Sequence, residues 1–470
     1  MDMSKTDPPA CGTRSSASEM IVSGHVSSAV WSVAWPTVIN TLILNAYTLI
    51  NTWFLGQLPN SGDPLAASGV GGQIMMIQFS LLIGLAAGTG ALVSQFLGAR
   101  RNDDAIGATR QSMLLSVVVA SISAIPLIVY ARPLMRMICD KPAIVPLAAD
   151  YTAIISCFSI ATFLYMIIVT ALRSAGDVKS ALYAGASVTV VNIVLDWFLI
   201  LGHGPFPVMG IRGAAWATGI SRIIGVLITI WFLKRSVLGE SFSHFKHHDG
   251  YTRQLLKIGW PAMLTNMLWS IAAALYVKVI AILPGSDAVA AYTVAMRLEC
   301  LAFMPGLAYS QAATPLVGQN LGAGKPDRAA HCAWIATLHA VAIMSFFALV
   351  FLVFPQQLAH PFAKNASPAV MPAIVLYLRI NAISEPFLAL NMVLRGALQG
   401  AGDTLMPALF TLISFYIVRL PLALLLSVHL GYGVTGAWIA MASSTILSGV
   451  LMAVWFQMGH WRRRSLVGAD

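Results

Sequence analysis

Long apolar stretches separated by short polar ones run through almost the whole chain. A helix needs about 20 mostly apolar residues to cross the hydrocarbon core of a bilayer, and twelve stretches meet that length. They span residues 28–55, 66–97, 107–130, 145–171, 179–202, 211–234, 255–284, 286–320, 330–354, 368–397, 405–429 and 434–458. The longest polar interval lies between the sixth and the seventh. The pattern therefore predicts an all-α integral membrane protein with twelve transmembrane helices in two six-helix lobes.

The two halves of the chain repeat each other. Four segments recur in the same order at offsets of 225, 224, 226 and 223 residues: VAWPTVINTLI at Val33 with IGWPAMLTNML at Ile258, VSQFLGARRNDDA at Val93 with VGQNLGAGKPDRA at Val317, ALRSAGD at Ala171 with ALQGAGD at Ala397, and GIRGAAW at Gly210 with GVTGAWI at Gly433. Six spans per half is an even number, so both halves have the same orientation and a pseudo-two-fold axis along the membrane normal relates them. Such repeats are typical of transporters, although a channel or a membrane enzyme can be duplicated too.

The polar segments set the expected boundaries. We expect a disordered cytoplasmic tail at residues 1–25, an N-lobe at 26–235, a cytoplasmic linker at 236–254, a C-lobe at 255–458 and a basic cytoplasmic tail at 459–470. Lys and Arg are more numerous in the loops on the side of the two tails than in the opposite loops. By the positive-inside rule, this distribution places both termini in the cytoplasm.

The composition agrees with a membrane protein and excludes several other classes. Hydrophobic residues make up 58% of the chain and charged residues only 10%, whereas soluble domains carry roughly 25% charged residues. We attribute the net charge of +10 to membrane topology and to affinity for anionic lipid, and we expect no nucleic-acid partner. The five cysteines are scattered without a CxxC pair, so neither a disulfide framework nor a metal site is indicated.

One apolar span, SVTVVNIVLDWFLIL from Ser187 to Leu201, contains an acid. Asp196 lies four residues after Asn192, so the two polar side chains share one helix face. Acids inside membrane helices are costly and usually face a bundle interior or a water-filled cavity. Two interpretations stay open: a buried hydrogen-bonded contact between helices, and a site for a proton, an ion or a substrate. The rest of the chain favours the second.

The repeated segments resemble those of the multidrug and toxic compound extrusion (MATE) family. The resemblance covers about residues 25–458 and is carried by the WP of each half, VSQFLGA, VGQNLGA, LRSAGD, LRGALQGAGD, RLECLAFMPGLAYSQA at Arg297 and RLPLA at Arg419. It implies two lobes around a central cavity that opens alternately to either side of the membrane. It also implies a secondary antiporter, not an enzyme, that exports cationic or amphipathic drugs and toxic compounds in exchange for protons or sodium.

The resemblance extends to a cation site in the N-lobe. In one branch of the family this site has a Tyr and an Asp one turn apart on the first helix, and an Asn and an Asp one turn apart on the fifth. Tyr47, Asn192 and Asp196 match three of these positions, whereas the fourth is Asn51; Thr218 on the sixth helix is a further candidate. With one carboxylate in place of two, we favour protonation of Asp196 over sodium binding, because a hard cation prefers more anionic oxygens.

The C-lobe offers further charged candidates. The seventh-helix acid of the sodium-coupled branch is missing, while Glu385 lies close to the position of that branch's acid on the tenth helix. Charged residues inside the predicted spans either couple ion movement or form buried ion pairs that hold the lobe together. Besides Glu385, these residues are Lys278, Arg297, Glu299 and Arg419.

Three functions compete at this point. The first is the antiporter, expected to be a monomer in a prokaryotic inner (plasma) membrane, with no cofactor beyond its coupling ion and no metal other than sodium at Asp196. The second is a flippase for lipid-linked saccharides, in which the C-lobe cations face a pyrophosphate. The third is a membrane-embedded transferase, whose clustered candidates, His244, His247 and His248, lie in the linker without a matching acid motif.

Overall fold

The protein is all-α, as its hydropathy predicts. The computed structural model describes residues 16–58, 62–139, 141–204, 206–242, 249–283, 287–363, 369–464 and 466–467. The first half contains α1 (Ser16–Ser23), α2 (Val26–Gly56), α3 (Gly62–Gly98), α4 (Asn102–Val129), α5 (Ala131–Ile138), α6 (Ile144–Cys157), α7 (Ser159–Ser174), α8 (Val178–Leu201), α9 (Ile211–Lys234) and the 3-10 segment η1 (Gly239–Phe242). The second half contains α10 (Asp249–Ala281), α11 (Asp287–Gly322), α12 (Pro326–Val353), α13 (Pro355–Ala363), α14 (Val370–Ala382), α15 (Glu385–Gly400), α16 (Leu405–Leu412), η2 (Ile413–Arg419), α17 (Leu420–Leu424), η3 (Leu425–His429), α18 (Gly433–Met458) and η4 (His460–Arg463).

The twelve predicted spans correspond to these helices. Within the described ranges, ten helical segments are long and apolar enough to cross a membrane, and two bent helix pairs bring the number to twelve if each pair is one span. The pairs are α6 with α7, bent by 54°, and α14 with α15, bent by 56°. They are the fourth and the tenth spans, which are equivalent in the repeat. Pro386 explains the second break, because proline lacks an N–H and disfavours a helical residue before it. The hydropathy pattern, which gave each pair as one continuous span, predicted neither bend.

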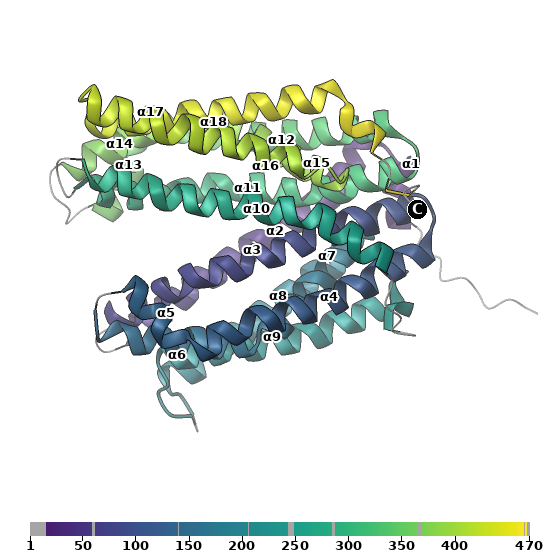
Figure 1. Ribbon diagram of the computed structural model, residues 1–470, viewed down its shortest axis with the longest axis horizontal. Helices are drawn as coiled ribbons and strands as arrows, with labels where there is room; N and C mark the ends of the chain where they lie inside the picture. The colour runs from purple at the N-terminus through teal and green to yellow at the C-terminus, as the bar shows by residue number, and fades with distance from the viewer. Residues whose placement is uncertain are drawn as a thin grey trace, which may run out of the picture.

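The helices form two groups that lie together at one end of the molecule and diverge at the other. Figure 1 shows α10 to α18 in one group and α4 to α9 in the other, with α1 and the C-terminus at the end where the groups converge. We call this the terminal end. Helix α3 packs against α10 and α11 as well as α4, and α2 packs against both α8 and α11. These two helices therefore join the lobes.

The lobes approach each other closely at the terminal end, where α3 crosses α11. A Cβ atom added to Gly98 would lie 2.0 Å from the Gln319 carbonyl oxygen, and one added to Gly322 would lie 1.9 Å from the Gln95 carbonyl oxygen. Gly98 and Gly322 are equivalent residues of the repeated VSQFLGA and VGQNLGA segments. Because glycine has no Cβ, the two backbones can approach to a distance that any other residue would prevent.

The N-terminal tail is more ordered than the sequence suggested. Residues 16–23 form α1, so the prediction of a disordered tail over residues 1–25 is wrong for this part, while residues 1–15 lie outside the described residues. The Ile21 side chain is only 1% exposed. The Ile21 carbonyl accepts hydrogen bonds from Asn320 at 3.2 Å and from Arg328 at 3.1 Å. Apolar burial and these donors at the helix C-terminus hold α1 against α11 and α12.

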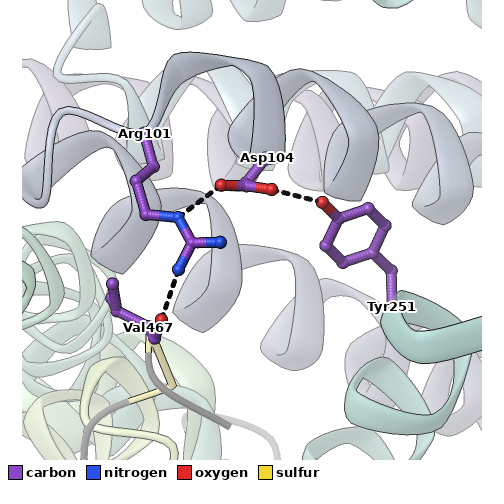
Figure 2. A network of polar contacts seen from close by, with 4 residues as sticks. All are labelled: Arg101, Asp104, Tyr251 and Val467. Carbon is purple, nitrogen blue, oxygen red and sulfur yellow. Dashed lines mark hydrogen bonds and ion pairs between the residues drawn. The ribbon is translucent and has the colours of Figure 1, made fainter. Parts of the chain in front are cut away.

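The C-terminal segment reaches the opposite lobe at the terminal end. Figure 2 shows the contacts: Arg101 donates to the Val467 carbonyl and pairs with Asp104 at 2.5 Å, and the Tyr251 hydroxyl donates to Asp104 at 2.6 Å. Arg101 and Asp104 belong to the N-lobe, whereas Tyr251 lies on α10 of the C-lobe. Polar contacts thus join the lobes on the outside of the helix crossing.

Candidate functional site

A chain of hydrogen bonds joins α2, α8 and α9 inside the N-lobe. The Asn51 side chain donates to the Tyr47 hydroxyl at 3.3 Å, and that hydroxyl lies 3.1 Å from the Thr218 hydroxyl. Ser221, one turn further along α9, donates to the Thr218 carbonyl at 2.8 Å and accepts from Asn192 Nδ2 at 3.2 Å. The chain thus connects four of the five N-lobe candidates through Ser221, which the sequence analysis did not single out.

Asp196 is the acid of this polar region. It follows Asn192 by one turn on the same face of α8, and its side chain is fully buried. In the part of the chain that the structure describes, neither carboxylate oxygen has a hydrogen-bond partner, and Asn192 Oδ1 and Asn51 Oδ1 lack one as well. An unpaired charge is costly to bury inside a membrane protein. A bound proton would remove that cost, and a small cation would find several unused oxygen ligands.

Two of the buried carboxylates in the C-lobe, Glu299 and Glu385, are predicted site residues. Glu299 on α11 accepts a hydrogen bond from the Tyr377 hydroxyl on α14. Glu385 is 1% exposed at the bend between α14 and α15, and its Oε2 atom has no partner among the described residues. Both residues are candidates of the sequence analysis, and the role of Glu385 in holding a proton or a cation stays a prediction.

The predicted C-lobe ion pairs do not form within the described residues. Arg419 instead donates to the Ser444 hydroxyl at 2.7 Å and to the Thr445 hydroxyl at 2.9 Å, and its guanidinium carbon lies 3.9 Å from the centre of the Phe415 ring. Neutral hydroxyl groups on α18 and an aromatic face therefore satisfy this buried cation. Glu299 has the tyrosine hydroxyl as its partner, so both members of the expected pair are occupied elsewhere.

Two further C-lobe candidates are not buried inside the lobe. Lys278 and Arg297 are both exposed, so the prediction of a buried pair that includes Arg297 is wrong. Arg297 precedes Glu299 by two residues, a rotation of about 200° on a helix, which turns one side chain outward when the other is buried. Lys278 lies in the last turn of α10, where a long side chain can extend towards the membrane surface. Exposure alone does not place these two cations around a pyrophosphate, so the flippase site stays a prediction.

A cavity of about 270 Å³ lies between the lobes, and its walls come from α3 and α7 on one side and α10, α11, α15 and α16 on the other. Phe79, Met166 and Leu307 contribute apolar surface. Arg173 and Arg395, one from each lobe, contribute charge, and the sequence analysis selected neither as a site residue. Both arginines belong to segments that mark the family resemblance, which is the signal that could have pointed to them.

Two equivalent glutamines join the lobes beside the glycine crossing. Gln95 donates to the Gly400 carbonyl at 3.0 Å, and Gln319 donates to the Ser174 carbonyl at 2.7 Å. Each also accepts: Gln95 from the Leu466 amide at 2.9 Å, and Gln319 from the Ser18 hydroxyl at 3.1 Å. Both glutamine side chains are fully buried. The repeated segments therefore form a symmetric connection between the lobes and the two chain ends, which we call the glutamine latch.

Gln95→Leu and Gln319→Leu are each expected to favour opening at the terminal end. Each substitution leaves a buried carbonyl of the opposite lobe without its donor, which costs about 1–3 kcal/mol. Spin labels at Asp103→Cys and His331→Cys, in a background without native cysteines, would report the distance across this end. We expect a larger long-distance population in each variant and a still larger one in the double variant.

The control for the latch is Gln78→Leu. Gln78 donates to the Ser159 hydroxyl at 2.9 Å inside the N-lobe, so its loss should lower Tm without changing the distance distribution. Equal distance distributions in the wild-type protein and the double variant would show that the glutamines do not hold this end closed.

The histidine cluster of the transferase hypothesis lies outside the described residues. Among the residues that the structure does describe, no group of three or more His, Cys, Asp or Glu residues is placed to hold a metal ion.

Comparison with known proteins identifies a family in both halves of the chain. The MatE family model matches residues 36–198 and 261–425. The chain is 28% identical over 440 residues to the transporter YisQ of Bacillus subtilis, covering 92% of this chain and 95% of that protein. It is 28% identical over 471 residues to the multidrug resistance protein NorM of Burkholderia vietnamiensis (97% and 98% covered), and 26% identical over 433 residues to a FAD transporter of Shewanella oneidensis (92% and 94% covered).

Solved structures show the same fold. An outward-facing multidrug resistance transporter of the MATE family superposes with a TM-score of 0.86 at 23% identity, covering 94% of this chain and 97% of that one. A MATE structure in the straight conformation gives a TM-score of 0.87 at 22% identity with the same coverage. The two-lobed, multi-span architecture of this chain is therefore the fold of these structures.

Proposed function

Because this chain belongs to the MatE family of multidrug and toxic compound extrusion transporters, we propose that it exports amphipathic small molecules in exchange for protons. The observation that carries the proposal of proton coupling is the fully buried carboxyl group of Asp196, which has no hydrogen-bond partner among the described residues. A single acid among neutral polar groups favours a proton over sodium, because sodium binds more tightly where several anionic oxygens meet.

The proposed cycle is alternating access between the two lobes. Protonation of Asp196 removes the charge from the N-lobe interior and changes what α2, α8 and α9 can hydrogen-bond. The Tyr47–Thr218 contact joins α2 to α9, and α2 also packs on α11 of the other lobe. A change around Asp196 would therefore reach the lobe interface through α2.

The proposed orientation places the terminal end in the cytoplasm of a prokaryotic cell with the protein in its plasma membrane. Its support is the positive-inside rule, since Lys and Arg are more numerous in the loops at the terminal end. In this orientation the described conformation opens outward, because the lobes converge at the terminal end and diverge at the other (Figure 1).

Family membership does not fix the charge of the exported molecule. One relative is named for multidrug resistance and another for FAD transport. The family resemblance suggested a cationic or amphipathic substrate. We keep the amphipathic character, which the mixed polar and apolar walls of the inter-lobe cavity support.

A proton gradient alone is expected to drive transport. Purified protein in liposomes would be given either a pH gradient or a sodium gradient, and movement of rhodamine 6G, a cationic dye, and fluorescein, an anionic dye of related structure, would be followed by fluorescence. We expect at least one dye to move about tenfold faster with the pH gradient than without it, and no acceleration by sodium. Liposomes without protein are the control.

Acceleration by sodium alone would contradict proton coupling. It would instead favour sodium at Asp196, with the Asn51 and Asn192 oxygens as further ligands, or sodium at Glu385 in the C-lobe. Movement of neither dye under either gradient would contradict the proposed export of amphipathic dyes.

A further inference from the structure

The inter-lobe cavity carries a positive charge that its own walls do not neutralise. Arg173 comes from the last turn of α7 and Arg395 from α15. Arg173 donates to the side-chain oxygen of Gln311, which is neutral. No hydrogen bond or ion pair is found for Arg395 within the described ranges, and no Asp or Glu is among the described residues that line the cavity.

The buried acids of the C-lobe lie elsewhere. Glu385 precedes Arg395 by ten residues, about 15 Å along a helix at 1.5 Å per residue. Glu299 is eleven residues before Ser310, a lining residue, and accepts from Tyr377. Asp403, close in sequence to the lining residue Thr404, pairs with Arg464 at 3.2 Å. These carboxylates therefore leave the two cavity guanidinium groups uncompensated.

We propose that the cavity binds an amphipathic organic anion, whose carboxylate or phosphate group lies between Arg173 and Arg395. The proposal rests on the proposed function, because it takes this cavity as the place where the exported molecule binds. It replaces the cationic substrate that the family resemblance suggested.

The chemistry of arginine supports this assignment. A guanidinium group that lines a cavity loses part of its hydration, which is costly unless water or an anion satisfies it, and its planar arrangement of donors suits the two oxygens of a carboxylate or phosphate. A cationic drug would meet like charge instead. The apolar side chains of Phe79, Met166 and Leu307 provide contact surface for the rest of an amphipathic molecule.

The position of the two arginines connects binding to the transport cycle. One arginine belongs to each lobe, so an anion between them contacts both. It would stabilise conformations in which Arg173 and Arg395 are close and would be released when lobe movement separates them. This provides a structural reason why substrate binding and lobe movement are coupled.

Equilibrium binding without any ion gradient tests the proposal separately from proton coupling. Fluorescence polarisation would measure the Kd of fluorescein and of rhodamine 6G for the full-length protein in detergent micelles. We expect wild-type protein to bind fluorescein at least tenfold more tightly than rhodamine 6G. Arg395→Gln and Arg173→Gln should each weaken fluorescein binding about tenfold or more, as expected for the loss of a charge-assisted hydrogen bond.

Further variants keep the test informative if one substitution destabilises the protein. Arg395→Lys retains the charge and should retain most of the fluorescein affinity, whereas Arg395→Glu should reverse the preference towards rhodamine 6G. Arg379→Gln is the matched control, because Arg379 on α14 is exposed and does not line the cavity. Tm of each variant would be measured in the same micelles.

Competition distinguishes the two sources of the anionic group. Decanoate would supply a carboxylate and farnesyl pyrophosphate a phosphate, and displacement of fluorescein by either one supports an anion site. Stronger displacement by farnesyl pyrophosphate would identify a phosphorylated lipid as the preferred class. The proposal would be overturned if rhodamine 6G bound as tightly as fluorescein and Arg395→Gln kept the full fluorescein affinity. That result would not bear on proton coupling, which the gradient experiment tests separately.

Discussion

The Asp196→Asn protein should fold and bind its substrate but fail to transport it when a proton gradient is imposed. Asparagine has nearly the same shape as aspartate, and neither Asp196 oxygen has a hydrogen-bond partner in the described structure whose loss would destabilise the fold. Asparagine cannot take up and release a proton at neutral pH, so proton movement would no longer accompany the change between conformations. We expect dye transport driven by a pH gradient to fall to the rate of protein-free liposomes.

Two measurements separate loss of coupling from loss of structure. Tm of Asp196→Asn should remain within a few degrees of the wild-type value, because the substitution exchanges one unpartnered buried polar group for another. Asp63→Asn is the matched control, since Asp63 is an exposed N-lobe aspartate at the start of α3. Proton-driven transport that persists in Asp196→Asn would exclude this residue from coupling and direct attention to Glu385.

The repeat in the sequence predicted the two-lobed architecture because four segments recur in the same order at nearly constant offsets. This evidence does not depend on where each apolar stretch begins and ends. It indicated two lobes, and the segments VSQFLGA and VGQNLGA turned out to cross each other and to join those lobes. Asn192 and Asp196 could also be grouped from their four-residue spacing, which places them on one helix face. Tyr47, Asn51 and Thr218 came from the family resemblance, because local periodicity does not connect different helices.

The outward or inward direction of single charged residues could not be predicted in the same way. A membrane helix is apolar on the side that faces lipid as well as on the side that packs against other helices, so hydropathy does not distinguish the two. Arg297 was therefore taken for a buried residue although it is exposed, and Arg419 was paired with an acid although it contacts Ser444 and Thr445.

The cavity residues required the relative placement of the lobes. Arg173 and Arg395 are far apart in sequence and are not equivalent positions of the repeat: the LRSAGD and LQGAGD segments align Arg173 with Gln399. No periodicity therefore connects the two arginines. They lie around one cavity only because α7 and α15, from different lobes, approach the same space.

The last prediction concerns the crossing of α3 and α11. Gly98→Ala and Gly322→Ala should each prevent the lobes from closing at the terminal end. The new methyl group would lie 2.0 Å or 1.9 Å from a backbone oxygen of the opposite lobe, far inside the contact distance of about 3.5 Å. Backbone atoms cannot move aside as a flexible side chain can, so the helices must separate by more than about 1 Å. That separation would also lengthen the hydrogen bonds of the glutamine latch.

The distance between labels at residues 103 and 331 should therefore increase in both glycine variants, and transport should fall at least tenfold. Because Gly98 and Gly322 are equivalent in the repeat, we expect the two variants to behave alike, and each serves as a replicate of the other.

Gly72→Ala is the control on the same helix as Gly98, since a Cβ at Gly72 would meet no atom within 4 Å. Normal transport and an unchanged label distance in Gly98→Ala would show that the lobes do not need this close backbone contact. A longer label distance with slower transport would mean that closure at the terminal end requires a residue without a Cβ atom at both positions. This requirement would explain why both copies of the repeat have glycine there.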